Sequence, residues 1–356
     1  MTVTVRSFAK INLGLRIGAA RADGFHELLT VYQTIGLHDV IRLSVGRGTG
    51  IEIQCDDPRV PRDESNTCHR MVSRALEALD AKGRVLIEIK KRLPVQGGLG
   101  GASANAVACL LGLERVLKKS LPAAERLRIA AEVGSDLPLF LIGGTVLGVG
   151  RGEEVYPLVD LPSIPCVVVT PEVGVSTPKA FADWDRRAQD DAALKGRSST
   201  VSGTELASHR GTDECVRPYA SGEKLTVEDG SDRMDELGRG LSAWLSEAYS
   251  SAPHSFVAKR GHAGNHLLWL VRAGIENDFE QVVFPEYPEL REGKRALERA
   301  GAKYASLSGS GSTLYGLFGS KTAAGRAVVS LRKQGWAARA TSTLTRRAYW
   351  SRIFDC

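Results

Sequence analysis

One segment of this 356-residue chain constrains its fold more than any other: the glycine-rich loop PVQGGLGGASAN at residues 94–105. Four of the five residues from Gly97 to Gly101 are glycines, which removes the Cβ atoms that would block a tight backbone and the close approach of a ligand. A β-branched run precedes the loop and an apolar helical pattern follows it. Backbone amides in such a loop converge near the positive end of the helix, so the segment predicts a site for an anion.

The loop differs from the two common glycine motifs that bind nucleotides. It lacks the Gly-Lys-Ser/Thr ending of a Walker loop. A dinucleotide fingerprint that begins at Gly98 would need glycine where Ser103 stands. A glycine-rich turn without a ligand is an alternative on the glycines alone. Ser103 is ambiguous as well, because a plain helix N-cap uses the same residue type.

Composition and charge limit the class of protein. The length suggests about two domains. The six cysteines form no CxxC pair, which favours a reduced, cytoplasmic chain over a disulfide or zinc framework. Residues 1–6 lack the apolar core of a signal peptide, and no run reaches the ~18 apolar residues of a membrane span. The formal net charge of +6 suits anionic ligands, but no basic stripe with interleaved aromatics supports the alternative of an RNA-binding module.

The chain alternates strand-like and helix-like segments up to about residue 160, and a second half follows. Alternating or β-branched patterns predict strands at 2–5, 11–17, 40–45, 51–54 and 85–89, and helical patterns cover 66–79, 103–117 and 123–132. In the second half we expect a buried strand at 165–170, a helix at 290–300 and a strand–loop–strand around 305–313. The predicted domains are therefore 1–160 and 161–356.

Composition changes between about residues 185 and 265. This stretch is rich in Ser, Gly and charged residues, and its one helical stripe lies at 234–248. Its apolar content is too low to offset the conformational entropy of the chain, so we expect a long polar insertion that is mostly disordered. Covering the substrate cleft or mediating assembly are the alternatives. We expect order to return at 266–273.

Three motifs, in order along the chain, resemble those of the GHMP kinase superfamily, which includes galacto-, homoserine, mevalonate and phosphomevalonate kinases. FAKINL at 8–13 is similar to the first motif, the glycine loop to the second, and LSGSGST at 307–313 to the third. The resemblance implies an α+β fold with a ribosomal protein S5 domain 2-like N-terminal domain and a ferredoxin-like C-terminal domain. It also implies ATP as a substrate, with Mg²⁺ bound mainly through its phosphates.

Two further segments point to one branch of that superfamily. RADGFHEL at 21–28 and GSDLP at 134–138 resemble signatures of the 4-diphosphocytidyl-2-C-methyl-D-erythritol kinases. The resemblance implies phosphorylation of the 2-hydroxyl of that cytidylyl substrate, in the non-mevalonate route to isoprenoids. A kinase of homoserine or mevalonate type is the alternative, although such an enzyme has no need for the cytosine site that Phe25 and His26 imply. We expect a monomer or a homodimer, without nucleic acid or membrane partners.

The resemblance also assigns roles to single residues. Asp136 is expected to be the general base, assisted by Lys10; an interior lysine is costly unless paired, so a plain salt bridge is the alternative. The expected ATP-binding residues are Asn66, Pro94, Gly97, Gly98, Leu99, Gly100, Gly101, Ala102, Ser103 and Ala104. Ser103 is the candidate contact to a phosphate or to Mg²⁺, and Asn66 also fits a simple N-cap. The expected substrate-binding residues are Asn12, Phe25, His26, Tyr32, Phe181, Gly309 and Ser310, with Phe25 and Phe181 stacking on the cytosine while His26 reads its edge.

Overall fold

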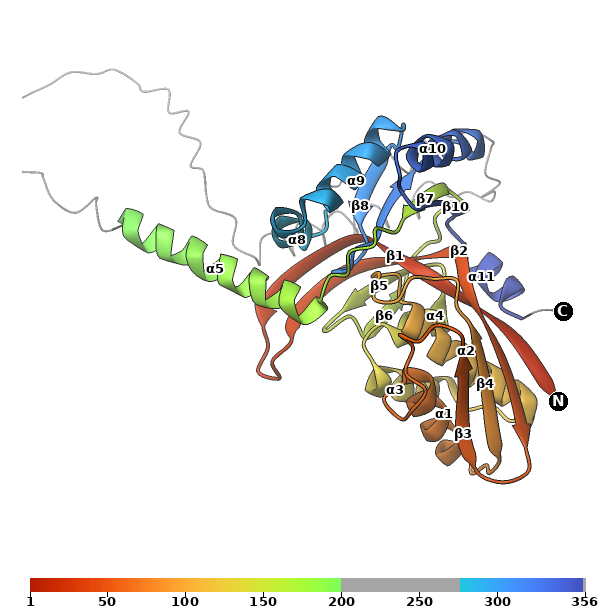
Figure 1. Ribbon diagram of the computed structural model, residues 1–356. Coiled ribbons are helices and arrows are strands. Elements are labelled where there is room, and N and C mark those ends of the chain that lie inside the picture. The colour runs from red at the N-terminus through yellow and green to blue at the C-terminus, as the bar shows by residue number, and fades with distance from the viewer. Residues whose placement is uncertain (200–275, 355–356) are drawn as a thin grey trace, which may run out of the picture.

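The computed structural model describes residues 1–199 and 276–354 of the chain (Figure 1). The helix predicted at 234–248 and the ordered segment expected at 266–273 lie outside the described residues, as does most of the expected insertion. No helix in the described ranges is long and apolar enough to cross a membrane.

The first sheet has six strands, of which the first two are the longest. β1 (Thr2–Ala20) and β2 (His26–Gly46) form an antiparallel pair, and the remaining strands are β3 (Gly50–Cys55), β4 (Arg84–Lys90), β5 (Thr145–Val149) and β6 (Glu154–Pro157). Their order is β3-β4-β2-β5-β6, with β1 on β2. We expected two separate strands at 2–5 and 11–17, but the structure has one strand. Polar residues such as Arg6 and Lys10 interrupt the apolar pattern, while the pairing with β2 continues across a register shift between Phe8 and Lys10.

Four helices belong to the core of the first sheet. They are α1 (Thr67–Ala78), α2 (Gly101–Leu117), α3 (Ala123–Val133) and α4 (Leu137–Ile142). α1 is the crossover between the parallel strands β3 and β4, a connection that parallel pairing requires. α2 packs against α1, β1 and β2, and every residue from Ala104 to Glu114 is buried. A helix enclosed in this way is apolar on all sides, which explains the uninterrupted apolar run after the glycine loop.

The second sheet has four antiparallel strands. These are β7 (Pro165–Val169), β8 (Tyr304–Leu307), β9 (Leu314–Leu317) and β10 (Ala338–Ser342), in the order β10-β7-β9-β8. The short helix α8 (Glu280–Glu286) precedes α9 (Pro288–Arg299), and α9 and α10 (Lys321–Lys333) pack against these strands (Figure 1). The chain order β7-α9-β8-β9-α10-β10 is a βαββαβ arrangement. The ferredoxin-like domain expected from the sequence is confirmed.

The helix α5 (Thr177–Ser199) follows β7 and extends well beyond residue 185 (Figure 1). The expectation of disorder from about residue 185 is therefore wrong for residues 185–199. Asp183 pairs with Lys179 at 3.0 Å and with Arg186 at 2.7 Å, and ion pairs at such spacings support a helix. The first turns also pack Phe181 and Trp184 against the second domain's core, so this polar helix has an apolar support that composition alone did not reveal.

A third apolar cluster joins the two sheets. Ala9, Ile11 and Leu13 of β1 lie in this cluster with Cys166 and Val168 of β7. Successive side chains of a strand point to opposite faces, so Lys10 and Asn12 point away from the interface between the sheets. The alternation that builds the domain interface therefore also places two polar residues of the first motif on one side of the sheet.

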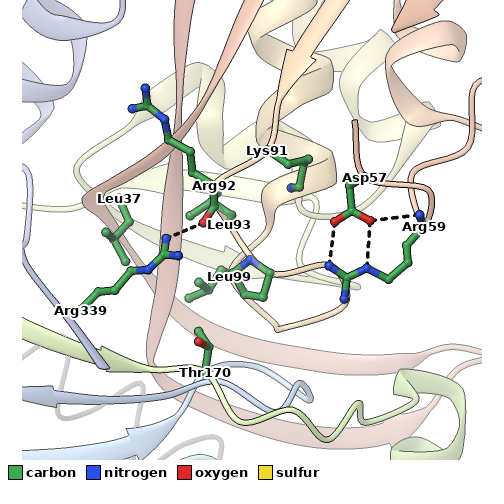
Figure 2. Close-up of a pocket in the computed structure, with 10 residues that line it drawn as sticks. Leu37, Asp57, Arg59, Lys91, Arg92, Leu93, Leu99, Thr170 and Arg339 are labelled. Carbon is green, nitrogen blue, oxygen red and sulfur yellow. Dashed lines mark hydrogen bonds and ion pairs between the residues drawn. The ribbon is translucent and has the colours of Figure 1, made fainter. Parts of the chain in front are cut away.

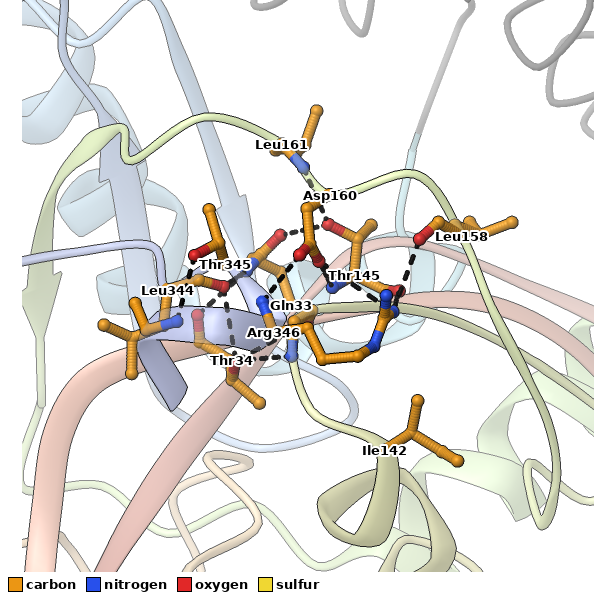
Figure 3. A network of polar contacts seen from close by, with 12 residues as sticks. Gln33, Thr34, Ile142, Thr145, Leu158, Asp160, Leu161, Leu344, Thr345 and Arg346 are labelled. Carbon is orange, nitrogen blue, oxygen red and sulfur yellow. Dashed lines mark hydrogen bonds and ion pairs between the residues drawn. The ribbon is translucent and has the colours of Figure 1, made fainter. Parts of the chain in front are cut away.

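The last helix, α11 (Arg346–Arg352), returns to the first domain (Figure 1). Tyr349 is buried in the first core and donates to the carbonyl of Phe140 at 2.7 Å. Beside it lies a network of buried polar contacts (Figure 3). In this network Gln33 donates to Leu344 O at 2.8 Å, and Arg346 N donates to Asp160 Oδ2 at 2.7 Å. The C-terminal segment is thus part of the N-terminal domain's packing.

Candidate active site

A cavity of about 610 Å³ is lined by residues of both domains. The lining contains nearly all the residues predicted from the sequence, namely Lys10, Asn12, Phe25, His26, Tyr32, Asn66, Pro94, Gly97, Gly98, Leu99, Gly100, Gly101, Ala102, Ser103, Asp136, Phe181, Gly309 and Ser310. Ala104 was also predicted, but it does not line this cavity. Its side chain is buried in the first core, since it lies on the inner face of α2.

The predicted pair of Lys10 and Asp136 is present at the cavity wall. Lys10 Nζ lies 3.3 Å from Asp136 Oδ2, with the lysine side chain 4% exposed and the aspartate 33% exposed. Lys10 Nζ also donates to Asn12 Oδ1 at 2.6 Å. A buried ammonium needs such partners. The difference in exposure means that the carboxylate faces the cavity while the lysine supports it from the strand.

Tyr32 holds the other carboxylate oxygen. Its hydroxyl donates to Asp136 Oδ1 at 3.1 Å. Burial, and then the nearby charge of Asp136, raise the pKa of Tyr32 well above its usual value. Tyr32 is therefore a neutral donor over the whole physiological pH range, and Asp136 is oriented by one donor at each oxygen.

Irregular pairing of β1 with β2 brings these groups together. The register shifts between Phe8 and Lys10 and again between Asn12 and Gly14, and Asn12 pairs directly with Tyr32. Such bulges re-aim side chains and are frequent beside active sites. Asn12 Nδ2 donates to Thr30 Oγ1 at 2.8 Å, which fixes the amide so that its oxygen faces Lys10.

The glycine loop interlocks with the third motif. Thr313 N donates to Gly97 O at 3.2 Å, and Ser308 Oγ donates to Gly98 O at 3.0 Å. Gly98 has a φ of +77°, and a Cβ there would lie 2.1 Å from the carbonyl oxygen of Ser308. The requirement for glycine at this position therefore comes from a loop 210 residues away.

The start of α2 differs from one of the sequence-based alternatives. Gly100, with a φ of +67°, is the N-cap, so Ser103 lies in the first turn rather than at the cap. The reading of Ser103 as a plain N-cap is wrong, because the glycine loop itself closes the helix end. Within the described residues no protein group is hydrogen-bonded to the Ser103 hydroxyl, which lines the cavity and is available to a ligand.

Asn66 is an N-cap, as one reading of the sequence proposed. Its Oδ1 accepts from Cys68 N at 2.8 Å at the start of α1, and its Nδ2 donates to Pro61 O. The residue also lines the cavity. Both polar groups of the Asn66 side chain are hydrogen-bonded to backbone atoms, so Asn66 contributes to the cavity mainly as part of its wall.

Aromatic and acidic residues gather at the far end of the cavity. The His26 ring stacks on Phe181, with centroids 5.1 Å apart and planes at 14°. His26 Nε2 lies 2.7 Å from Asp185 Oδ1; a carboxylate can only accept, so Nε2 carries the hydrogen. Phe25 is half exposed. His26 therefore already occupies one face of Phe181, and the stacking of a base between Phe25 and Phe181 stays a prediction.

Sequence reasoning missed a buried carboxylate behind the glycine loop. Asp39 is fully buried and accepts from Lys91 Nζ and Arg92 N, both at 2.6 Å, from Leu93 N at 2.8 Å and from Asn105 Nδ2 at 3.1 Å. Lys91 lines the cavity beside the first turn of α2, since its Nζ would lie 3.4 Å from a Cβ at Gly101. A signal for this cation existed in the Lys90-Lys91-Arg92 run that ends β4.

A smaller cavity of about 270 Å³ adjoins the first one across Pro94 and Leu99 (Figure 2). Arg59 forms a two-point contact with Asp57, at 2.9 and 2.7 Å, and these hydrogen bonds hold the pKa of Asp57 at about 2. Arg339 of the second domain donates to Arg92 O at 2.6 Å. The backbone just before the glycine loop is therefore tied to both domains.

Comparison with known proteins agrees with the two-domain fold. Residues 66–144 match the model of the GHMP kinases N terminal domain, and residues 265–336 match that of the GHMP kinases C terminal. The 4-diphosphocytidyl-2-C-methyl-D-erythritol kinase of Solibacter usitatus is 36% identical over 91% of this chain and 84% of its own length. That of Acaryochloris marina is 33% identical over 90% and 88%.

A solved structure leads to the same family. The crystal structure of a 4-(cytidine 5'-diphospho)-2C-methyl-D-erythritol kinase superposes with a TM-score of 0.64 at 26% identity, over 96% of this chain and 98% of that one. The match extends over both domains and is not limited to the glycine loop. The chain belongs to the 4-diphosphocytidyl-2-C-methyl-D-erythritol kinase family, within the GHMP kinases.

Proposed function

We propose that this protein transfers the γ-phosphoryl group of ATP to the 2-hydroxyl of 4-diphosphocytidyl-2-C-methyl-D-erythritol, a step of the non-mevalonate route to isoprenoids. The observation that carries the proposal is the Lys10–Asp136 pair, which opens into the same cavity as the glycine loop and the Phe25–His26 segment. A phosphate-binding loop, a candidate base and an aromatic nucleoside end are thus available to one bound pair of substrates.

The reaction requires a held triphosphate and an aligned hydroxyl. In our proposal the amides of the glycine loop and the first turn of α2 bind the phosphates. Asp136 accepts the proton of the 2-hydroxyl while the hydroxyl oxygen forms a bond to the γ-phosphorus. The bond between the γ-phosphorus and the oxygen that bridges to the β-phosphate breaks, and ADP leaves. Lys10 and Tyr32 hold the carboxylate in place during this step, and the positive charge of Lys10 stabilises the charge that develops beside it.

Mg²⁺ is expected to bind mainly through the phosphates of ATP, whose charge it would neutralise. The described residues contain no group of three or more His, Cys, Asp or Glu side chains that could hold a metal by themselves. The Ser103 hydroxyl, an oxygen ligand of the kind that Mg²⁺ accepts, lines the cavity without a protein partner among the described residues. Ser103 is therefore the protein group proposed to contact the ion or a phosphate.

The substrate assignment is tested by following ADP release with ATP, Mg²⁺ and a panel of acceptors. The panel contains the cytidylyl methylerythritol, homoserine and mevalonate, each with the full chain. We expect turnover with the cytidylyl acceptor alone. Turnover of homoserine or mevalonate instead would remove the proposed substrate while leaving the kinase assignment in place. The cytoplasmic location and the monomeric or homodimeric state are predictions from the sequence that this assay does not address.

A further inference from the structure

Arg151 lies in the turn between β5 and β6 and lines the large cavity. Its guanidinium carbon is 5.0 Å from the centre of the Phe25 ring, and its Nε donates to Glu153 Oε1 at 3.0 Å. A guanidinium has five N–H donors. The four on the terminal nitrogens of Arg151 have no hydrogen-bond partner among the described residues, although the side chain is only 31% exposed.

The turn that carries Arg151 lies between the two ends of the proposed acceptor site. On one side the turn is packed against Tyr32, since a Cβ at Gly152 would lie 2.5 Å from the tyrosine oxygen. Tyr32 in turn contacts Asp136. On the other side Arg151 faces Phe25. Arg151 therefore stands at the wall between the candidate base and the aromatic nucleoside end.

The other cations of the cavity lining have different neighbours. Lys10 is bonded to Asp136 and Asn12, and Lys91 to Asp39. Arg59 is held by Asp57 on the side of the cavity that adjoins Pro94. Among the lysines and arginines of this lining, Arg151 is thus the one that lies over the ring of Phe25, the residue expected to stack on the nucleoside. Both of its terminal nitrogens are without a hydrogen bond in the described part of the chain.

We propose that Arg151 binds the diphosphate that links the nucleoside to the alcohol in the acceptor substrate. This inference rests on the proposed function, because it assumes that the nucleoside lies at Phe25 and the alcohol at Asp136. An acceptor that spans these two ends must pass its diphosphate along the wall between them. A guanidinium matches two phosphate oxygens with parallel N–H donors, and the Glu153 contact leaves those donors free.

Nearby carboxylates do not cancel this role. Glu153 uses the Nε side of the guanidinium. Burial opposes the ionisation of Asp23, but a hydrogen bond from Phe25 N and the charges of Arg21 and Arg151 lower the pKa of Asp23 below its usual value. Arg21 is itself bonded to Asp23 and Glu27. Asp23, Glu27 and Glu153 are therefore paired with arginines, and a diphosphate at Arg151 would not face isolated negative charges.

The test compares cytidine with cytidine diphosphate by titration calorimetry, in saturating non-hydrolysable ATP analogue so that the ATP site is filled. The wild-type chain should bind the diphosphate at least ~10-fold more tightly than cytidine, as charge-assisted contacts allow. Arg151→Gln should remove most of that difference while changing the affinity for cytidine by less than ~3-fold. Arg84→Gln is the matched control, since Arg84 is an exposed arginine that also pairs with a glutamate, Glu52, and it should behave as wild type.

Two results would overturn the inference alone: Arg151→Gln keeps the preference for the diphosphate, or it weakens both ligands equally, which would make Arg151 a support for Phe25. If wild type binds neither ligand, the proposed nucleoside site itself is wrong and the inference falls with it. If the glutamine variant does not fold, Arg151→Lys provides the same comparison, because lysine keeps the charge and loses the two parallel N–H donors. An intermediate preference for the diphosphate supports the role of Arg151, and an unchanged preference contradicts it.

Discussion

The Asp136 carboxylate is held at both oxygens by side chains of the β1–β2 pair. Lys10 contacts Oδ2, and Tyr32 donates to Oδ1. Both donors are nearly inaccessible to solvent, so they are fixed before any substrate arrives. A carboxylate oriented in this way loses little freedom when it accepts a hydrogen bond from an alcohol, which is the property expected of a preorganised base.

Replacing Asp136 by Asn separates the ability of this side chain to take up a proton from its shape and position. The amide keeps the shape of the side chain but cannot take up a proton, so turnover should fall by at least ~10²-fold with little change in ATP binding. ADP release and calorimetric ATP titration measure the two effects. Tyr32→Phe is the control, since it removes one orienting bond and leaves the carboxylate; its loss should be much smaller. Near-normal turnover of Asp136→Asn would exclude Asp136 as the base.

Asp185 holds the His26 ring through Nε2, which in the neutral imidazole leaves Nδ1 as the acceptor nitrogen. An acceptor is what the exocyclic amine of cytosine requires. Asp185→Ala should therefore raise KM for the cytidylyl substrate ~3- to 30-fold, the range of one lost or misaligned hydrogen bond, with kcat and the KM for ATP nearly unchanged. Asp183→Ala is the control, because Asp183 lies in the same helix but pairs with Lys179 and Arg186 instead of His26. A lower KM would contradict this and indicate that the pair holds the imidazole where the base should stack.

At this scale the sequence identified most of the cavity but not the partners of its residues. Lys10, Asp136 and the loop glycines were found because each sits in a short motif. Asp185 and Asp39 were not, because they act on residues distant in sequence: Asp185 lies 159 positions from His26, and Asp39 lies 52 positions from Lys91. Spacing within a motif carries no information on such contacts.

Two loops from different domains form the element proposed to bind phosphate. Thr313 N and Ser308 Oγ of the third motif donate to the carbonyls of Gly97 and Gly98. Neither loop has room for a side chain at this contact. A Cβ at Gly311 would lie 2.4 Å from Gly98 N, and one at Gly98 would lie 2.1 Å from Ser308 O. The proposed triphosphate site is therefore shaped at the domain interface, rather than by the first domain alone.

Gly98→Ala tests this interlock. The substitution adds a methyl group against backbone atoms and strains a residue at φ +77°, so it should weaken ATP binding strongly and cost at least about 1–3 kcal/mol of stability from the strain. Gly301→Ala is the matched control, because Gly301 has a φ of +95° but open space around its Cβ position. Thermal unfolding and ATP titration distinguish the two variants. Equal ATP affinity in both would show that the interlock does not shape the site.

Elements with a strong internal pattern could be predicted, and those whose stability comes from distant packing could not. The helices at 66–79 and 123–132 and the strands at 85–89 and 165–170 are confirmed by α1, α3, β4 and β7. The sequence predicts no helix at the position of α4, because Pro138 stands near its start and the helix has only six residues. It is held by Tyr349 of α11, a contact that no local pattern could indicate.

At the scale of the whole molecule, α11 connects the end of the second domain to the part of the first domain that carries Asp136 and α4. Tyr349 packs on α4 and bonds to the carbonyl of Phe140. The Phe140 ring in turn lies against Gly100, since a Cβ there would be 2.9 Å from its Cζ. The C-terminal helix therefore supports both Asp136, which lies at the N-terminal end of α4, and Gly100, where the glycine loop leads into α2.

Tyr349→Ala should thus affect activity as well as stability. Removing a buried aromatic side chain costs roughly 3–5 kcal/mol, and the loss of support for α4 should also lower kcat at temperatures where the variant is still folded. Thermal unfolding and turnover below the transition measure both effects. The exposed Arg347 of the same helix is the control: Arg347→Ala should change stability far less. A variant with normal kcat despite lowered stability would show that α11 stabilises the fold without supporting the site.

The return of the chain to its own first strand has a consequence for folding during synthesis. Arg6 N donates to Ile353 O at 2.7 Å, and Val5 pairs with Phe354. Residues 5 and 6 leave the ribosome early, while residues 353 and 354 leave it hundreds of residues later. Domains often fold in order from the N-terminus as they emerge. Here the contacts of Arg6 and Val5 cannot form before residues 353 and 354 emerge from the ribosome. A nascent chain therefore exposes this part of β1 until then.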